Sequence, residues 1–164
     1  RAYIASQSLR GAEFVPASIQ RAAAIDDNHA ERWPDSVPEW LRATFPYGPC
    51  EAAFVCLRYH DGATLLRLVL GGLKPNHLTF AAELLGDAVT PELAHDALLP
   101  LLGHASPIVR EGALYGMARL GIDMPVEFMP PTIAAAHAAI SRVARDDASL
   151  TIRHIATALL SAQA

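Results

Sequence analysis

The chain has 164 residues, of which 52% are apolar, so it has the length of one domain and can bury a substantial core. Its net charge at pH 7 is −4, which argues against nucleic acid as a partner, because such proteins neutralise phosphates with Lys and Arg. The stretch from Pro75 to Val109 contains neither Lys nor Arg. Length and composition therefore predict one domain over residues 1–164.

The two cysteines, Cys50 and Cys56, are predicted to be thiols. Six helical residues would separate them by about 9 Å along the helix axis, which exceeds the reach of a disulfide. The sequence shows no signal-peptide pattern and no apolar run long enough to span a bilayer. We therefore expect a cytoplasmic protein without a membrane partner.

The first sixty residues differ from the rest because they contain five prolines and both tryptophans. Proline interrupts helices, so the helices here should be short. One is predicted over residues 18–30, and a second begins with a capping box at Ser36–Glu39 and ends near Phe45. A third, over residues 50–59, has apolar residues at helical spacing. We expect residues 1–60 to form a helical cap, with Trp33, Trp40 and Phe54 as its covering side chains.

Beyond Asp61 the sequence consists of apolar helical segments separated by Gly, Pro and small polar residues. Proline opens several of them at Thr90-Pro91, Ser106-Pro107 and Pro130-Pro131, where the first helical turn has no amide to satisfy. A longer loop is expected over residues 121–131. The six segments form three predicted pairs: 63–73 with 77–87, 91–102 with 107–120, and 132–145 with 150–162.

The second helix of each predicted pair carries the same pattern. When the three helices are aligned at Leu78, Val109 and Ile152, apolar or small residues occur at i, i+3, i+4 and i+7. The i+4 residue is alanine in every case, which suits the close approach of a partner helix. The pattern reads Leu78, Ala81, Ala82 and Leu85 in the first helix, Val109, Gly112, Ala113 and Gly116 in the second, and Ile152, Ile155, Ala156 and Leu159 in the third.

The segment from Ser106 to Gly121, in which Val109-Arg110 precedes small residues, resembles the second helix of a HEAT repeat. Ile152-Arg153 repeats this pair, and Leu78-Thr79 is a weaker copy without the arginine. The resemblance to HEAT-like repeats, including those of the PBS-lyase type, covers about residues 61–163. It implies an all-α, right-handed α-α superhelix of about three helix pairs behind the cap, and a scaffold or adaptor role.

If the apolar pattern is buried, neighbouring positions point outward and form ladders across the repeats. We expect these ladders to bind a partner protein, without catalysis, cofactor or metal. The alternative is that the N-terminal helices cover Phe80 and Leu84, while Arg110 and Arg153 join adjacent repeats through turn carboxylates such as Asp147. The predicted partner-binding residues are Phe80, Leu84, Arg110, Glu111, Tyr115, Arg153 and His154.

Two His-Asp dipeptides, His60-Asp61 and His95-Asp96, resemble the metal-binding pair of HD-type phosphohydrolases. The second hypothesis is therefore a metal-dependent hydrolase that uses His60 and Asp61. It needs at least two further ligands near one point, which His29, Asp87 or His104 would have to supply. The chain has no His-Glu dipeptide, so the iron site of HEAT-like deoxyhypusine hydroxylase does not carry over.

Overall fold

A computed structural model describes residues 38–44, 48–122 and 125–162. Within these ranges the chain is all helical and contains no strand. The predicted helix over residues 18–30, Trp33, and Ser36 of the capping box lie outside the described residues. The α-helices are α3 Glu39–Thr44, α4 Pro49–His60, α5 Gly62–Leu70, α6 Pro75–Leu85, α7 Pro91–Leu98, α8 Pro107–Ala118, α9 Pro131–Asp146 and α10 Leu150–Ser161, and the short 3-10 helices are η1 Leu99–Gly103 and η2 Val126–Phe128.

Proline sets the helix starts that the sequence predicted. The helices α7, α8 and α9 begin at Pro91, Pro107 and Pro131, respectively. The predicted helix over residues 91–102 is instead two elements, because α7 ends at Leu98 and the chain continues as η1. Pro100 lacks the amide that would continue the α-helical hydrogen bonding at that point.

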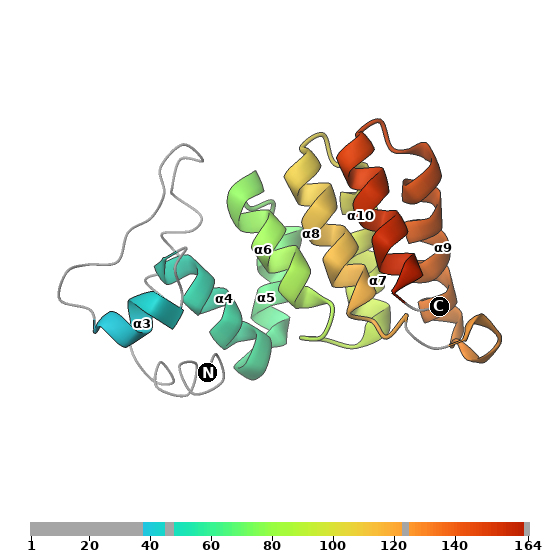
Figure 1. The fold of residues 1–164 in the computed structure, drawn as a ribbon. Coiled ribbons are helices and arrows are strands. Elements are labelled where there is room, and N and C mark those ends of the chain that lie inside the picture. The colour runs from blue at the N-terminus through green and yellow to red at the C-terminus, as the bar shows by residue number, and fades with distance from the viewer. Residues whose placement is uncertain (1–37, 45–47, 123–124, 163–164) are drawn as a thin grey trace.

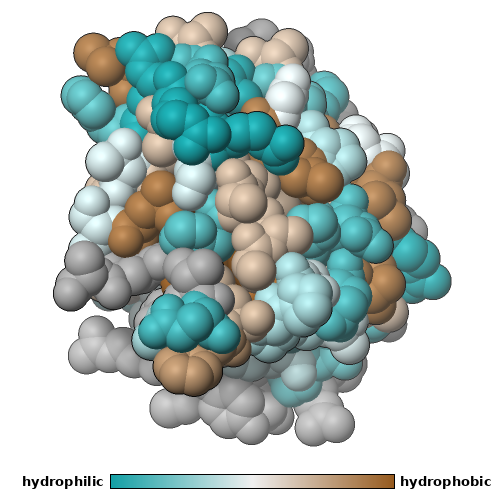
Figure 2. All heavy atoms as spheres, turned by 90° about the vertical axis from the view of Figure 1, so that its right-hand side faces the viewer, coloured by the Kyte–Doolittle hydropathy of each residue, from teal (hydrophilic) through white to brown (hydrophobic). Residues whose placement is uncertain are grey.

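The helices α6, α8 and α10 lie side by side in one layer, and α5, α7 and α9 form a second layer behind them (Figure 1). In chain order, α5 packs on α6, α7 and η1 pack on α8, and α9 packs on α10. At one end α4 contacts both α5 and α6. At the other end of the described layers lie α9 and α10, and Figure 2 looks onto this end.

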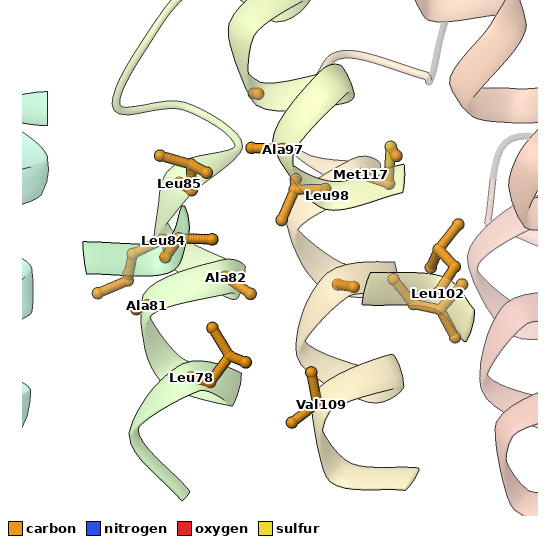
Figure 3. Close-up of a cluster of buried hydrophobic side chains, with 14 of the residues drawn as sticks. Leu78, Ala81, Ala82, Leu84, Leu85, Ala97, Leu98, Leu102, Val109 and Met117 are labelled. Carbon is orange, nitrogen blue, oxygen red and sulfur yellow. The ribbon is translucent and has the colours of Figure 1, made fainter. Parts of the chain in front are cut away.

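The apolar pattern of the second helices forms much of the core (Figure 3). All four of its positions are buried in α6 and in α8. In α10, Ile152 and Ala156 are buried, while Ile155 and Leu159 are partly buried against the same core. The alanines at the i+4 position, Ala82, Ala113 and Ala156, are each 0% exposed.

Glycine allows α6 and α8 to approach each other closely. A Cβ atom on Gly112 would lie 2.3 Å from the backbone oxygen of Thr79, and one on Gly116 would lie 2.3 Å from that of Ala82. Side-chain atoms do not approach backbone oxygens so closely without displacing a helix. The two small residues at i+3 and i+7 of α8 are therefore required by the packing of α6 against α8.

Candidate interaction surface

The turns that precede α8 and α10 are built in the same way. Before α8, the Nδ1 atom of His104 accepts a hydrogen bond of 3.0 Å from the backbone amide of Ser106. Before α10, Oδ1 of Asp147 accepts one of 2.8 Å from the amide of Ser149. The sequence signal for this shared turn is the Ala-Ser pair that follows each accepting residue, and apolar periodicity alone does not predict it.

An arginine six residues later completes each turn. Nη1 of Arg110 donates to the backbone oxygen of His104 at 2.9 Å, and Nη1 of Arg153 donates to that of Asp147 at 2.5 Å. Arg110 also holds the carboxylate of Asp147 with two hydrogen bonds, from Nε at 2.8 Å and from Nη2 at 3.0 Å. The guanidinium of α8 thus joins that helix to the turn between α9 and α10.

The Arg110–Asp147 pair is largely shielded from solvent, with side chains 12% and 7% exposed, respectively. Burial by itself would raise the pKa of Asp147. The hydrogen bonds from Arg110 and Ser149, and the positive charges of Arg110 and Arg153, outweigh burial and lower that pKa below its ordinary value. Arg110 therefore links α8 to the turn before α10 through Asp147, as the alternative hypothesis expected. The prediction that Arg110 is an outward position is wrong.

Thr79 makes the corresponding link between α6 and α8. It stands at the register position of Arg110, one residue after the first position of the apolar pattern. Its Oγ1 atom donates a hydrogen bond of 2.7 Å to the backbone oxygen of Ile108. A short hydroxyl reaches the next helix here because Gly112 lets the two backbones come close.

On α8 and α10 the outward positions are open to solvent. Tyr115 is 36% exposed, Glu111 is partly exposed, and His154 is exposed. Glu111 lies one turn before Tyr115 on the same side of α8. His154 is the register counterpart of Glu111 on α10. The structure thus places an aromatic ring, a carboxylate and an imidazole at accessible positions on two adjacent helices.

On α6 the outward positions are covered. Phe80 is partly buried and packs against the core, and Leu84, at 9% exposed, is buried. The prediction of Leu84 as an exposed anchor is therefore wrong. The reason is tertiary: α4 packs against α6, and Leu84 belongs to the same buried cluster as Phe54 and Leu57 of α4.

Further charged side chains join helices at the opposite end of α6 and α8. Nη2 of Arg119 lies 2.7 Å from Oε1 of Glu83, and its Nη1 lies 3.7 Å from Oδ2 of Asp87. Asp87 also pairs with Arg58 of α4. These contacts connect α4, α6 and α8, so the charges serve packing between helices.

An open pocket of about 460 Å³ adjoins the Arg110–Asp147 pair. It lies where the turn before α8 faces the last turn of α9. Two of its charged residues, Arg110 and Asp147, are paired with each other, whereas Arg142 and Asp146 are exposed. The lining residues are Leu102, Gly103, His104, Ala105, Arg110, Arg142, Val143, Asp146, Asp147 and Ala148.

The His-Asp dipeptides take part in local contacts. Asp61 caps α5, where its carboxylate accepts hydrogen bonds from the backbone amide of Thr64 at 3.0 Å and from its hydroxyl at 2.6 Å. The hydroxyl bond, followed by the amide bond, lowers the pKa of Asp61. Nδ1 of His95 lies 3.2 Å from Oδ1 of its neighbour Asp96.

The further ligands that a hydrolase would need do not converge in the described residues. No group of three or more His, Cys, Asp or Glu side chains there is placed to hold a metal ion. Asp87 pairs with arginines and His104 accepts from Ser106. His29 lies outside the described residues. The geometry of residues 38–44, 48–122 and 125–162 thus gives no support to the HD-type hypothesis.

The cysteines of α4 are buried thiols. Burial raises the pKa of Cys56, so this thiol stays protonated at neutral pH and is a poor nucleophile. Cys50 belongs to the apolar core cluster. Both side chains therefore contribute to packing.

Comparisons with known proteins do not assign this chain to a family. No protein-family model, curated protein or solved structure matches the chain. None of the helices in the described ranges combines the length and the apolar character needed to cross a bilayer. The described part of the chain defines an all-α fold in which helices α5 to α10 form two layers.

Proposed function

We propose that this chain is a non-catalytic module of HEAT-like helical repeats that binds a partner protein through the exposed side of α8 and α10. The repeat assignment is supported by the similar turns before α8 and α10 and by the arginine in the first turn of each helix that bonds to its turn. The fully buried alanine at the same place in α6, α8 and α10 supports it as well. The order in which α5 to α10 pack is compatible with a right-handed superhelix of three helix pairs.

The observation that carries the binding role is the exposure of Tyr115. Aromatic side chains on a rigid surface are frequent anchors in protein interfaces, because they bury a large area at low entropic cost. Half of α8 is committed to the core, because six of its twelve residues are buried, and Arg110 is paired. Tyr115, Glu111 and His154 are thus side chains of the second helices that remain available to a partner.

A protein partner in the cytoplasm agrees with the remaining features. The net charge is negative, which disfavours a phosphate backbone. The thiols of Cys50 and Cys56 are compatible with a reducing compartment.

Site-specific photo-crosslinking tests this role. A photoreactive phenylalanine analogue is placed at Tyr115, and a matched control carries it at Phe128 of η2, an aromatic position that is 74% exposed. In an extract of the cells that make the protein, we expect an intermolecular adduct from position 115 and none from position 128. Equal labelling from both positions, or none from position 115, would contradict the proposal.

Binding measurements with the identified partner complete the test. Tyr115→Ala should weaken binding by about tenfold or more, the effect of removing an anchor side chain. Phe128→Ala should leave the affinity unchanged. Thermal unfolding of both variants checks that each remains folded, and an unchanged affinity for Tyr115→Ala would refute the role of this side chain.

A further inference from the structure

The carboxylate of Glu111 has no charged partner within the described part of the chain. Glu111 is partly exposed and lies near the start of α8. The ion pairs of the described ranges use other carboxylates, namely those of Glu83, Asp87, Asp96 and Asp147. The Glu111 side chain makes no hydrogen bond there either. A carboxylate that the fold does not use, on a helix held by its core, can pair with a group of another molecule.

The arginines nearest to Glu111 along the chain are already committed to other carboxylates. Arg110, the preceding residue, holds Asp147 with two hydrogen bonds. Arg119, directly after α8, pairs with Glu83 at 2.7 Å through its Nη2 atom. These two guanidinium groups therefore do not neutralise Glu111.

The flanking helices supply no arginine or lysine at the register of Glu111. The helix α8 lies between α6 and α10 (Figure 1). The register counterparts of Glu111 are Phe80 on α6 and His154 on α10. The only lysine of the chain, Lys74, precedes α6 and takes part in none of the ion pairs of the described residues. The negative charge at this place on the surface is thus unbalanced by its neighbours.

Tyr115 adds an aromatic ring to this charge. It follows Glu111 by one helical turn on the same side of α8, and it is 36% exposed. The face of an aromatic ring attracts a cation, because the ring carries negative charge density on that face. A carboxylate and an exposed ring at this spacing are together complementary to the side chain of Lys or Arg.

The same combination of groups already binds a cation elsewhere in this molecule. The guanidinium carbon of Arg58 in α4 lies 5.1 Å from the centre of the Tyr59 ring, and the same guanidinium pairs with the carboxylate of Asp87. One arginine thus interacts with a ring and a carboxylate at once. Glu111 and Tyr115 offer both of these groups, and the described residues do not provide the cation.

We infer, on the basis of the proposed function, that the partner protein presents a Lys or Arg side chain that pairs with Glu111 and packs on the ring of Tyr115. A basic partner surface complements the net charge of −4 of this chain. A partner with an acidic or wholly apolar surface would cover Glu111 without supplying a counter-charge, which is unfavourable.

A charge-removing variant tests the contact with the partner that is photo-crosslinked from position 115. The linked peptide, identified by mass spectrometry, should contain Lys or Arg at or beside the linked residue. Glu111→Gln keeps the size of the side chain but removes its charge, and should weaken binding of the purified partner by about tenfold. The matched control is Glu127→Gln, which removes an exposed carboxylate of η2 and should leave the affinity unchanged. Thermal unfolding checks that both variants are folded.

An exchange of charges identifies the two groups that meet. Glu111→Lys should abolish binding, and replacement of the partner's linked Lys or Arg by Glu should restore binding to this variant. The contribution of the ring is measured separately. Tyr115→Phe keeps the ring and should retain most of the affinity, whereas Tyr115→Leu keeps apolar area without the ring and should weaken binding by about fivefold.

The results distinguish this inference from the proposed function. No adduct from position 115 would contradict both. Loss of binding in Tyr115→Ala, together with an unchanged affinity of a folded Glu111→Gln variant, would overturn the inference and leave the proposed function in place. A linked segment without Lys or Arg, a charge exchange that does not restore binding, or a second copy of this chain as the partner would overturn the inference as well.

Discussion

The interface between α6 and α8 and the interface between α8 and α10 use the same register but different chemistry. The first brings two backbones together at Gly112 and Gly116, and a threonine hydroxyl bonds to the next helix. In the second, Ile155 and Leu159 stand where α8 has its glycines, and Arg110 reaches the next turn through its long side chain. A short side chain therefore links the helices where glycines separate them, and a long side chain links them where Ile155 and Leu159 separate them.

The largest loss of stability is expected from a larger residue at the close contact between α6 and α8. Alanine normally stabilises a helix relative to glycine by about 1 kcal/mol. In Gly112→Ala, however, the new Cβ would meet the backbone oxygen of Thr79 at 2.3 Å, so we expect a net loss of about 3 kcal/mol in the free energy of unfolding. Denaturation by urea measures it.

Gly103→Ala is the matched control for that substitution. A Cβ there meets nothing within 4 Å, so the free energy of unfolding should change by less than about 0.5 kcal/mol. A stabilised Gly112→Ala variant would show that α6 and α8 do not rely on close backbone contact.

Removing the ion pair between Arg110 of α8 and Asp147 before α10 should cause the second-largest loss of stability. Arg110→Met leaves the carboxylate of Asp147 shielded without its guanidinium, and we expect a loss of about 2 kcal/mol. The control is Arg119→Met, which removes the contacts with Glu83 and Asp87, all three side chains being 33% to 36% exposed, and should cost less than about 1 kcal/mol. Equal losses in urea denaturation would show that shielding of the first pair is unimportant.

Acid should weaken the same link. Folding lowers the pKa of Asp147, so its contribution to stability is present above the unfolded value near 3.8 and is lost as the pH falls through the lower folded value. As the pH falls below about 4, the wild-type chain should lose stability more steeply than Asp147→Asn does. Urea midpoints across that range measure the difference, and parallel curves would contradict the prediction.

The smallest effect is expected at Thr79. Replacement by valine keeps the shape but removes the donor to the Ile108 oxygen, and should cost about 1 kcal/mol. Thr157→Val is the control, because its hydroxyl donates to the Arg153 backbone oxygen at an exposed position within α10 and should contribute little. If thermal unfolding showed a loss of stability for Thr157→Val and none for Thr79→Val, the hydrogen bond from Thr79 would not be the one that stabilises the fold.

Periodicity predicted the helices well because each is set by local chemistry. The start of α8 at Pro107 needs no tertiary information, and the buried positions along α6 and α8 follow from helical spacing. The end of α7 at Leu98 was missed, although Pro100 carries the signal. The side chains predicted to point outward were less predictable, as Leu84 shows by its burial.

Leu84 and Tyr115 show where prediction from spacing stops. They occupy the same register position on α6 and α8, yet the first is buried and the second is 36% exposed. The difference arises from α4, which packs against α6 and comes from a region with no repeat pattern. The side of a helix on which a residue lies depends on local spacing. Its exposure depends on which other helix packs against that side.

The amino-acid sequence by itself determined the starts of α7, α8 and α9, the apolar faces of α6 and α8 and the small residues between these two helices, because these features depend on spacing, proline chemistry and side-chain size along one segment. Only the tertiary structure decided that Arg110 holds the carboxylate of Asp147 and that Leu84 is covered. Those outcomes depend on distances between segments far apart in the chain, which packing of the helix layers sets.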